Sequence, residues 1–444
     1  MEKSSLSYFK TLWLRLAAAV LLSTAFFAYA ILKPAFGIEA PLDIYTSAML
    51  FSSLYLAVLI AFSFDKNTDN ISLLFLAAAT AALLYLRLSM LGYRSGDYNS
   101  FLNPWIEQMK ALSVKEALCE KIGDYNMPYL YFLLIVSRLK GFSLIHIKWL
   151  SCLFDFVGAY FVMKIVGLKS KSVVARYFSF IIAAALPTVF LNSAYWGQCD
   201  SIVCAFSVMS LYFALCGKGV GSVVSYALAF SIKLQAIFVL PALIVCFIVK
   251  KIKPWTAALF PSTFFATLLP ALLAGRSFWD CVRIYFDQTE QYPRLTLNAP
   301  TLWQLLGNFN FDYFSSVGVM LGGIAAISLI YISYKYKNGI DNAAIIEIFF
   351  ISALLIPFLL PRMHERYFYI ADILSLLIFF NDKKKWYVPL VTVFASLNAY
   401  LAYLSGNTLV PQSWAALGLL VIIILSVKNL LERIKGDETP RKAA

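Results

Sequence analysis

The segment PRMHERYFYIAD, residues 361–372, concentrates charged side chains between two apolar runs. It contains Arg362, Glu365 and Arg366, together with His364, one of only two histidines in the 444-residue chain. Arginine presents planar N–H donors that match the oxygens of a phosphate or a carboxylate. The H-E-x-x-H pattern of a zinc protease is incomplete, because its second histidine is missing. The segment is therefore a candidate anion-binding site or, alternatively, an ion-paired cap that closes a helix hairpin.

A second polar group lies in NSAYWGQCDS, residues 192–201, between two other apolar runs. It contains Asn192, Gln198 and Asp200 beside Trp196. Polar side chains that join two apolar runs are expensive in a membrane unless they bind one another or a ligand. Trp196 can also be an ordinary interfacial anchor, and Asp200 can be a helix cap. The sequence leaves both interpretations open.

A third group is SIKLQ, residues 231–235, where Lys233 and Gln235 interrupt a long apolar stretch. A lysine can extend its ammonium group towards the membrane surface. An ionisable group in such surroundings is nevertheless a functional hypothesis by default. Asp155 lies in another apolar run, SCLFDFVGAYF, and its partner is not evident from the sequence, so its role can be purely structural.

The fourth group is YRSGDYNSFLNPW, residues 93–105, which follows an apolar run. Gly96 allows tight backbone geometry, and Asp97 comes next, with Arg94 shortly before it. Asp97 is a carboxylate at the point where the chain leaves the membrane, and it can be the N-cap of a helix in the following loop. A weaker signal, NAPTLWQLLG, begins at Asn298 and again combines amide, proline and tryptophan.

The composition indicates that these groups belong to an integral membrane protein. The chain is 61% hydrophobic and only 14% charged, with a mean hydropathy of +0.75, whereas soluble domains carry about 25% charged residues. The net charge of +13 comes from Lys and Arg at the ends of apolar runs, which indicates cytoplasmic loops rather than nucleic-acid binding. Seven cysteines without paired spacing predict neither a disulfide framework nor a zinc site.

The apolar runs predict an all-α fold, a polytopic transmembrane bundle of about 13–15 spans. The first run is too long for a signal peptide, and we expect it to be a retained helix. Residues 128–139 are too short to cross without tilt or thinning, and we expect a re-entrant or interfacial segment there. The remaining runs predict fourteen crossings: 13–32, 44–64, 71–91, 143–163, 174–191, 200–216, 219–233, 235–250, 255–274, 316–334, 342–360, 366–380, 387–404 and 411–428.

Basic residues at 164–176, 250–253, 335–337 and 383–385 mark cytoplasmic ends by the positive-inside rule. This orientation brings all four polar groups to the extracytoplasmic face. The expected organisation is as follows: N-terminal transmembrane helices, 1–91; first extracytoplasmic loop with the interfacial helix, 92–142; transmembrane helices, 143–274; second extracytoplasmic loop, 275–315; C-terminal transmembrane helices, 316–432; cytoplasmic tail, 433–444.

The converging groups combine a carboxylate, several cations, amides and aromatic rings. Aromatic faces and amides suit sugars, cations suit phosphate, and a lipid tail would explain a site at the membrane edge. A sugar linked to a lipid phosphate meets all three demands.

The sequence resembles membrane glycosyltransferases of the C superfamily, which use polyprenyl-phosphate-linked sugars. More narrowly, it is similar to the bacterial mannosyltransferases related to the enzyme of GPI-anchor synthesis. The three expected helices before Asp97 exceed the superfamily's usual single leading span. The motifs that carry the resemblance occur in order: GDYNSFLNPW (96–105), YNMPYLYF (125–132), YWGQCDS (195–201), KLQ (233–235), NAPTLW (298–303) and PRMHERYFYIAD (361–372).

The resemblance implies an enzyme of the bacterial plasma membrane that transfers one hexose, mannose in this family, to a hydroxyl of a lipid, glycan or protein. It implies that Asp97 is the catalytic carboxylate, and we expect it to act as general base with inversion at the anomeric carbon. The expected phosphate-binding residues are Lys233, His364 and Arg366, then Arg94 and Arg362. The expected sugar- or acceptor-binding residues are Asn192, Trp196, Gln198, Asp200, Gln235, Asn298 and Glu365.

We expect no cofactor. Carboxylates at Asp97, Asp200 or Glu365 would suit Mg²⁺ or Mn²⁺, but the abundance of cations favours a mechanism without metal. Two other functions stay open: a transporter or flippase, with Lys233, Asp155 and Glu347 along its path, and a ligase or polymerase that moves whole glycans from lipid pyrophosphate. A non-enzymatic scaffold would leave the convergent polar groups unexplained.

Overall fold

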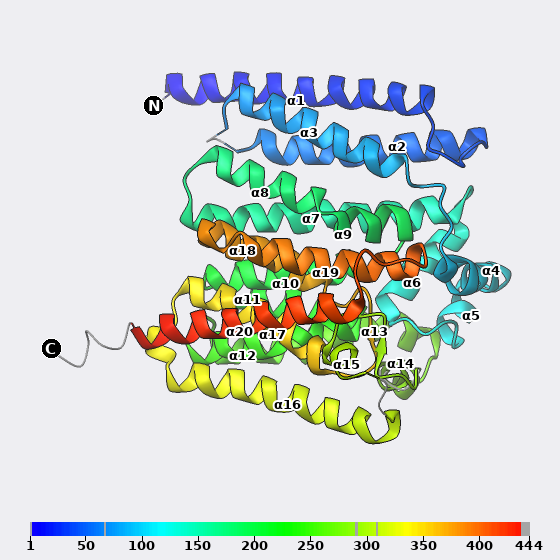
Figure 1. The fold of residues 1–444 in the computed structure, drawn as a ribbon. Coiled ribbons are helices and arrows are strands. Elements are labelled where there is room, and N and C mark those ends of the chain that lie inside the picture. The colour runs from blue at the N-terminus through cyan, green and yellow to red at the C-terminus, as the bar shows by residue number, and fades with distance from the viewer. Residues whose placement is uncertain (1, 66–67, 289–291, 308–309, 437–444) are drawn as a thin grey trace.

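The computed structural model describes residues 2–65, 68–288, 292–307 and 310–436. These residues form an almost entirely helical bundle, in which most helices run side by side along one direction (Figure 1). Within the described chain, nine helices are long and apolar enough to span a membrane. They are α1 (Glu2–Leu32), α2 (Pro41–Ser63), α3 (Asn70–Leu88), α7 (Ser143–Lys169), α13 (Leu259–Ala274) together with the preceding η4 (Pro254–Ala258), α16 (Phe311–Lys335), α17 (Asn342–Leu359), α19 (Tyr387–Leu404) and α20 (Gln412–Gly436).

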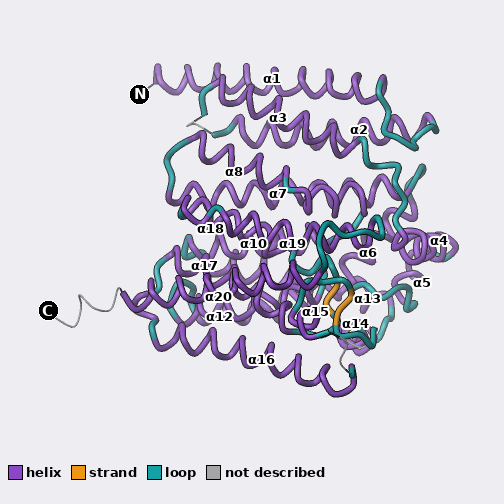
Figure 2. The backbone as a smooth tube through the Cα atoms, viewed as in Figure 1, coloured by secondary structure: helices purple, strands orange, loops and turns teal. Residues whose placement is uncertain are grey.

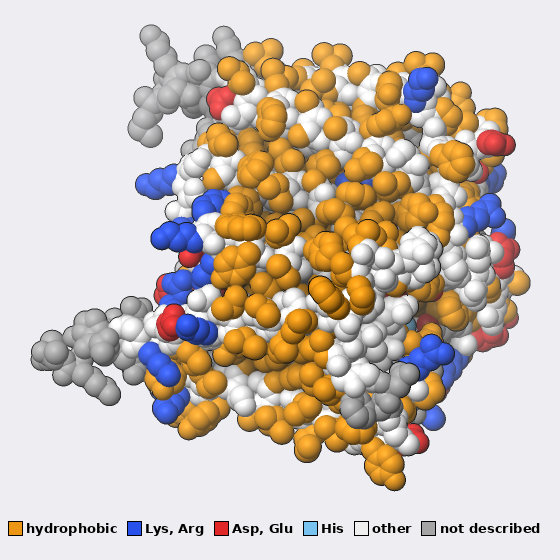
Figure 3. All heavy atoms as spheres, in the orientation of Figure 1, with side chains coloured by type: hydrophobic (Ala, Val, Ile, Leu, Met, Phe, Trp, Pro, Cys, Tyr) orange, Lys and Arg blue, Asp and Glu red, His pale blue; other side chains and the backbone are white. Residues whose placement is uncertain are grey.

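The outer helices expose apolar side chains in a way that only lipid makes favourable. In the apolar stretches that contain α13 and α16, 11% and 17% of the residues are buried inside the protein. The middle of the face in Figure 3 is correspondingly apolar, and charged side chains lie at its two ends. A helix that is apolar all round belongs in a core or in a bilayer. The expected class, a predominantly helical multi-pass integral membrane protein, is confirmed.

Several helices are shorter or broken. Helix α8 (Val173–Ala185) continues through α9 (Pro187–Phe190) and the π-helical η2 (Leu191–Trp196) with a bend of 48°. Pro187 explains the bend, because proline lacks an N–H group and excludes the α conformation from the residue before it. The other short apolar helices are α6 (Met127–Arg138), α10 (Asp200–Leu215), α11 (Gly219–Ile232), η3 (Leu234–Val239) with α12 (Leu240–Ile248), and α18 (Tyr369–Asn381).

The two ends of the bundle differ in structure. The loop end, on the right in Figure 1, carries residues 92–142, 275–288 and 292–307. The basic end, on the left, carries the start of α1, the end of α20 and the lysines of residues 250–253 and 383–385. The loop end contains η1 (Tyr98–Leu102), α4 (Asn103–Ala111), α5 (Val114–Cys119), α6, α14 (Phe278–Asp287) and α15 (Leu302–Leu306). The remaining short helices are η4 (Pro254–Ala258), η5 (Lys337–Gly339) and η6 (Lys383–Lys385).

One small sheet departs from the all-helical expectation. Strands β1 (Thr296–Leu297) and β2 (Met363–His364) pair in parallel, with Thr296 opposite Met363 and Leu297 opposite His364 (orange in Figure 2). The pairing fastens the loop after α14 to the segment between α17 and α18. A two-residue ladder between distant segments leaves no periodic signal in the sequence.

The core contains an ion pair that supplies the partner of Asp155. Arg87 of α3 and Asp155 of α7 have fully buried side chains, with Nη2 3.0 Å from Oδ2. The same carboxylate accepts hydrogen bonds from Ser193 of η2 at 2.5 Å and from Tyr369 of α18 at 3.1 Å. The Arg87 guanidinium also donates to the carbonyl oxygen of Ala184 in α8. Asp155 therefore links four segments of the bundle.

Candidate functional site

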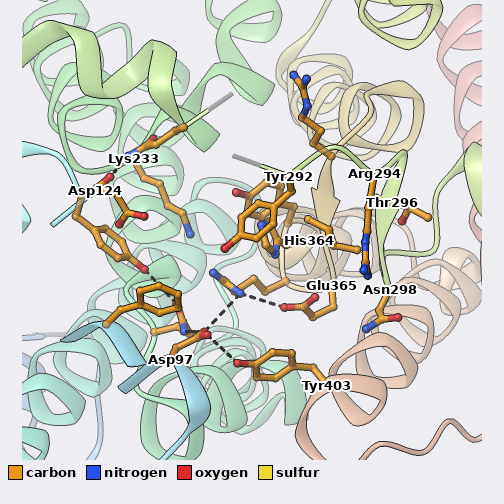
Figure 4. Close-up of a pocket in the computed structure, with 18 of the residues that line it drawn as sticks. Asp97, Asp124, Lys233, Tyr292, Arg294, Thr296, Asn298, His364, Glu365 and Tyr403 are labelled. Carbon is orange, nitrogen blue, oxygen red and sulfur yellow. Dashed lines mark hydrogen bonds and ion pairs between the residues drawn. The ribbon is translucent and has the colours of Figure 1, made fainter. Parts of the chain in front are cut away.

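A cavity of about 300 Å³ opens at the loop end of the bundle. Its walls come from residues 97–125 after α3, Gln198 before α10, Lys233 between α11 and η3, the loop after α14, the segment between α17 and α18, and the end of α19. Figure 4 shows side chains from several of these parts around this space. Segments that are far apart in the sequence thus build one site.

Asp97 is held by donors from two other parts of the chain. Its Oδ2 accepts hydrogen bonds from Trp196 Nε1 at 3.0 Å and from Gln198 Nε2 at 2.5 Å, and its Oδ1 accepts from the Tyr403 hydroxyl at 2.7 Å. The side chain remains 21% exposed and lines the cavity. The carboxylate is therefore fixed in orientation and accessible to a small molecule.

The local backbone explains how these donors reach Asp97. A Cβ atom on Gly96 would lie 3.3 Å from the Tyr403 hydroxyl, so glycine leaves room for the tyrosine. Gly197 has φ of +83°, a left-handed conformation that glycine adopts easily. This turn ends η2 and lets Trp196 and Gln198 both contact the Asp97 carboxylate. Ser95 also donates to the carbonyl oxygen of Trp196 at 2.9 Å, tying the two loops together.

A buried lysine also binds the loop between α3 and Asp97. Lys148 of α7 is fully buried, and its Nζ donates to the carbonyl oxygens of Met90, Leu91 and Tyr93 at 3.0, 3.0 and 2.7 Å. These carbonyl groups follow the end of α3. Lys148 thus supplies hydrogen-bond donors to three peptide oxygens of the loop that leads to Asp97.

Asp200 organises two cations from distant segments. Its Oδ1 accepts from Lys233 Nζ at 2.6 Å, and its Oδ2 lies 3.5 Å from Arg366 Nε. Asn192 Nδ2 completes the arrangement with a hydrogen bond to Oδ2 at 3.0 Å. The Asp200 side chain is fully buried, and the residue is not part of the cavity wall. It positions Lys233 and Arg366, which do face the cavity.

Arg366 lies among three carboxylates. Its Nη1 is 3.0 Å from Glu365 Oε1 and 3.8 Å from Asp97 Oδ2, in addition to its contact with Asp200. Burial opposes the charge, but the neighbouring carboxylates Asp200, Glu365 and Asp97 raise the pKa of Arg366 well above its usual value. Burial also raises the pKa of Glu365. The guanidinium is thus a permanent positive charge at the cavity wall.

His364 lies in the cavity wall as a neutral imidazole. Its ring centroid is 5.1 Å from that of Tyr292 and 5.2 Å from that of Tyr367. Burial, followed by the positive charges of Arg366 and Lys233, lowers the pKa of His364 to about 2. At neutral pH it can donate a hydrogen bond to an anion, but it does not carry the positive charge of the two cations.

The strand pairing positions the last part of the wall. Asn298 and Arg362 adjoin the two strands with φ of +59° and +62°, a left-handed conformation that is uncommon outside glycine. Both residues line the cavity. Left-handed backbone at two positions of one wall is a strained arrangement of the kind found at ligand sites.

The structure brings eight of the thirteen predicted site residues into the cavity wall: Asp97, Gln198, Lys233, Asn298, Arg362, His364, Glu365 and Arg366. Asn192, Trp196 and Asp200 lie behind it and contact wall residues or one another. Gln235 is also buried, and its Nε2 donates to the carbonyl oxygen of Tyr367 at 3.4 Å. Arg94 is not part of the wall, because its guanidinium lies 4.6 Å from the ring centroid of Phe142.

Sequence reasoning missed several residues of the site. Tyr403 lies at the end of α19, where a tyrosine is typical of an interfacial anchor. Tyr292 and Arg294 lie in a loop without a recognisable motif. Phe101, Trp105, Tyr125 and Tyr367 belong to motifs that the sequence singled out, but their individual roles there were not evident.

Among the residues that the structure describes, no group of three or more His, Cys, Asp or Glu side chains is arranged to hold a metal ion. The cavity wall instead combines four cationic and three acidic side chains with amides and aromatic rings; the charged residues are Lys233, Arg294, Arg362, Arg366, Asp97, Asp124 and Glu365. This combination can bind an anion and accept a proton from a hydroxyl group that approaches Asp97.

A scan against protein-family models found no match, and neither did a search of the curated proteins.

Proposed function

We propose that the protein is an inverting membrane glycosyltransferase that moves one hexose from polyprenyl phosphate to an acceptor hydroxyl. The observation that carries this proposal is the shared cavity of Asp97 and Arg366, whose Oδ2 and Nη1 atoms are 3.8 Å apart. A base and a cation in one cavity can act on the same bound substrate, Asp97 on the acceptor hydroxyl and Arg366 on the donor phosphate. The motif resemblance to C-superfamily glycosyltransferases, with mannose as the sugar, supports the same assignment.

Asp97 is the proposed general base. Two N–H donors already engage Oδ2, whereas Oδ1 receives the Tyr403 hydroxyl among the described residues. A carboxylate oxygen accepts two hydrogen bonds, so Oδ1 has room for the acceptor hydroxyl. As the acceptor oxygen bonds to the anomeric carbon, its proton passes to Oδ1. General base catalysis of this kind contributes roughly 10²–10⁴-fold.

Arg366 and Lys233 are the proposed phosphate-binding cations. The donor is a phosphodiester with one negative charge, and the bond from the anomeric carbon to the phosphate oxygen breaks with its electron pair. The leaving polyprenyl phosphate then carries a second charge, so one negative charge moves from Asp97 to the phosphate. Arg366 contacts Asp97 and can stabilise the charge at both positions. Preorganised cations of this type are an effective source of transition-state stabilisation.

The aromatic residues of the wall suit the sugar and the lipid. Phe101, Trp105, Tyr125 and Tyr292 line the same cavity as the charged groups. Their faces offer apolar contact for the C–H surface of a sugar ring, and their place at the loop end suits a donor whose tail stays in the membrane. We propose that this end is extracytoplasmic, because lysines gather at the other end.

The proposed topology has fourteen crossings. It consists of the nine long helices, the bent pair and four of the five shorter helices, with α6 left at the loop end beside α4 and α5.

The alternative function, a transporter, would need a substrate path along Lys233, Asp155 and Glu347. Each of these groups has its own ion-pair partner, namely Asp200, Arg87 and Lys385. This pairing favours the enzyme.

The test is transfer by purified protein from a panel of donors to native membrane lipids, with products identified by mass. The panel contains polyprenyl-phosphate mannose, glucose and galactose, and a pyrophosphate-linked oligosaccharide. We expect a single hexose to be added, and Asp97→Asn to lower the rate at least about 100-fold. The control is Asp280→Asn, an exposed aspartate at the same end of the molecule.

Three outcomes would contradict the proposal. Near-native turnover by Asp97→Asn would remove Asp97 from the base role. Transfer of the oligosaccharide alone would favour a glycan ligase. Movement of substrate across vesicle membranes without a covalent product would favour a transporter.

A further inference from the structure

A second cavity, of about 950 Å³, opens at the basic end of the bundle. The ends of α2 and α7, the start of α8 and one residue of α10 form its walls. In Figure 1 the end of α7 and the start of α8 lie on the left, across the bundle from the candidate site. This cavity has no part in the proposed transfer reaction.

Positive charge dominates the second cavity. Lys164, Lys171 and Arg176 line it, together with a single carboxylate, Asp65. Arg176 and Asp65 form an ion pair with each other. Neither Lys164 nor Lys171 has an ion-pair partner within the part of the chain that the structure describes. Two positive charges in the wall therefore lack a counter-charge from the described residues.

Lys164 lies below the rim of the cavity. It precedes the last residue of α7 by five positions, which corresponds to about 7–8 Å of helix. Its Nζ is 6.0 Å from the ring centroids of both Tyr160 and Tyr212, which also line the cavity. An ammonium group between two phenol rings is a recognition surface for an anion with hydroxyl groups, since each phenol can donate a hydrogen bond.

The rest of the wall is apolar and reaches the outer surface. Phe62 and Met163 are buried, whereas Phe64 and Leu168 are 54% and 47% exposed. The cavity thus joins a cationic interior to an exposed apolar rim. A small soluble anion would use the first feature only, whereas a lipid would use both.

We propose that this cavity binds an anionic phospholipid, with the headgroup phosphate at Lys164 and Lys171 and the start of an acyl chain against Phe64 and Leu168. Basic pockets between transmembrane helices are known to hold anionic lipid headgroups. Arg176 is already neutralised by Asp65, so the two lysines supply the attraction. The proposal is independent of the transferase assignment.

The experiment uses the full-length protein in nanodiscs and native mass spectrometry. We compare retention of phosphatidylglycerol with that of phosphatidylcholine, and measure whether inorganic phosphate competes. Wild-type protein should retain phosphatidylglycerol selectively, without displacement by millimolar phosphate. At about 1 kcal/mol for each lysine near an anionic lipid, Lys164→Gln/Lys171→Gln should weaken retention about thirtyfold.

The matched control is Lys218→Gln/Lys253→Gln, which removes two exposed lysines outside the cavity at the same end. Equal loss in the control would show unspecific charge attraction and overturn the proposal. Displacement by inorganic phosphate would assign the cavity to a free anion and also overturn the proposal.

A second experiment uses wild-type protein and a photoreactive phosphatidylglycerol. The lipid should label peptides within residues 160–176, and labelling confined to other peptides would contradict the site.

Discussion

At the scale of single residues, the position of Asp97 depends on side chains from η2, the following loop and α19. Trp196 and Gln198 come from one part of the chain, and Tyr403 follows them by about two hundred residues. The Trp196 and Tyr403 rings are also stacked, with centroids 4.5 Å apart. The aromatic pair therefore supports one side of the carboxylate.

The Tyr403 hydroxyl donates a hydrogen bond to Oδ1 of Asp97, the oxygen that we propose takes up the proton of the acceptor. In Tyr403→Phe the ring remains stacked on Trp196, but Oδ1 loses its hydrogen bond. A hydrogen bond to a charged group contributes about 1.5–3 kcal/mol, so we expect kcat to fall about tenfold or more. KM for the donor should change less than about threefold, because the phosphate-binding cations are intact. Tyr313→Phe, an exposed tyrosine of α16, is the control; a change confined to KM would contradict the positioning role.

We expect His364 to make the free energy of unfolding depend on pH. Its folded-state pKa is lowered to about 2, whereas an unfolded histidine titrates near 6.5. Below about pH 6.5 the unfolded chain takes up a proton that the folded chain does not, so the free energy of unfolding falls as the pH falls.

We expect His364→Gln to reduce this dependence. Between pH 7.5 and 5.5 the variant should lose about 1 kcal/mol less unfolding free energy than wild-type protein, measured by denaturant titration at both values. The raised pKa of Glu365 acts in the opposite direction, but it is common to both proteins and cancels in the comparison. The same pH dependence in both proteins would contradict the neutral, partly buried imidazole.

From the sequence we could identify several ionisable residues of the site, but not the groups with which they pair. Lys233, Asp200 and Arg366 stand out because charge is rare in an apolar chain. Arg87 and Lys148 are just as buried, yet they lie near the ends of apolar runs, where a basic residue is typical of an ordinary loop boundary. Which carboxylate or carbonyl group each cation meets depends on helix packing, which composition and spacing do not specify.

At the scale of elements, a close helix contact supports the wall formed by β1 and β2. A Cβ atom on Gly318 of α16 would lie 2.6 Å from the Trp303 ring, 3.0 Å from Pro361 and 3.1 Å from the Leu359 carbonyl oxygen. Trp303 donates from Nε1 to the carbonyl oxygens of Leu359 and Leu360. Glycine at position 318 thus lets α16 approach both segments that the sheet joins.

Gly318→Ala should therefore lower the free energy of unfolding by about 1–3 kcal/mol, the usual cost of overpacking. Transfer activity should fall with it, because β2 leads directly into Glu365 and Arg366. Gly323→Ala in the same helix meets no atom within 4 Å, so we expect no loss of stability from this control. Thermal unfolding in detergent compares the two, and equal stability of both variants would contradict the packing role of Gly318.

The helices themselves were largely visible in the sequence, because apolar length is a strong signal. Residues 128–139 were expected to form a short separate segment, and α6 covers Met127–Arg138. The run 174–191 was expected to be one span, but it breaks before Pro187 and continues as η2 to Trp196. The π-helical turn places Trp196 and Asn192, and its altered hydrogen bonding has no residue pattern of its own.

At the scale of the whole molecule, the candidate site depends on how α1–α3 attach to the rest of the bundle. Arg87 of α3 reaches Asp155 of α7, and this carboxylate also holds Ser193, three residues before Trp196. A connected set of contacts therefore runs from α3 to the donor of Asp97. Helices before Asp97 are thus part of the support of the site.

We expect Arg87→Met to lower the free energy of unfolding by about 3–5 kcal/mol, because it leaves the Asp155 charge buried without its partner. Replacing both residues, in Arg87→Met/Asp155→Leu, removes the charge as well and should recover most of that loss. The surface pair of Lys428 and Glu432, 3.9 Å apart and largely exposed, provides the control, and Lys428→Met should change stability little. Chemical unfolding of all four proteins gives the comparison.

The double variant also separates stability from positioning. It leaves this part of the core uncharged but gives Ser193 no carboxylate to bind, so η2 loses one of its hydrogen bonds to α7. We therefore expect transfer activity to remain below that of wild-type protein even where the unfolding free energy is recovered. Full activity in the double variant would show that the ion pair supports the fold alone and leaves the position of Trp196 unchanged.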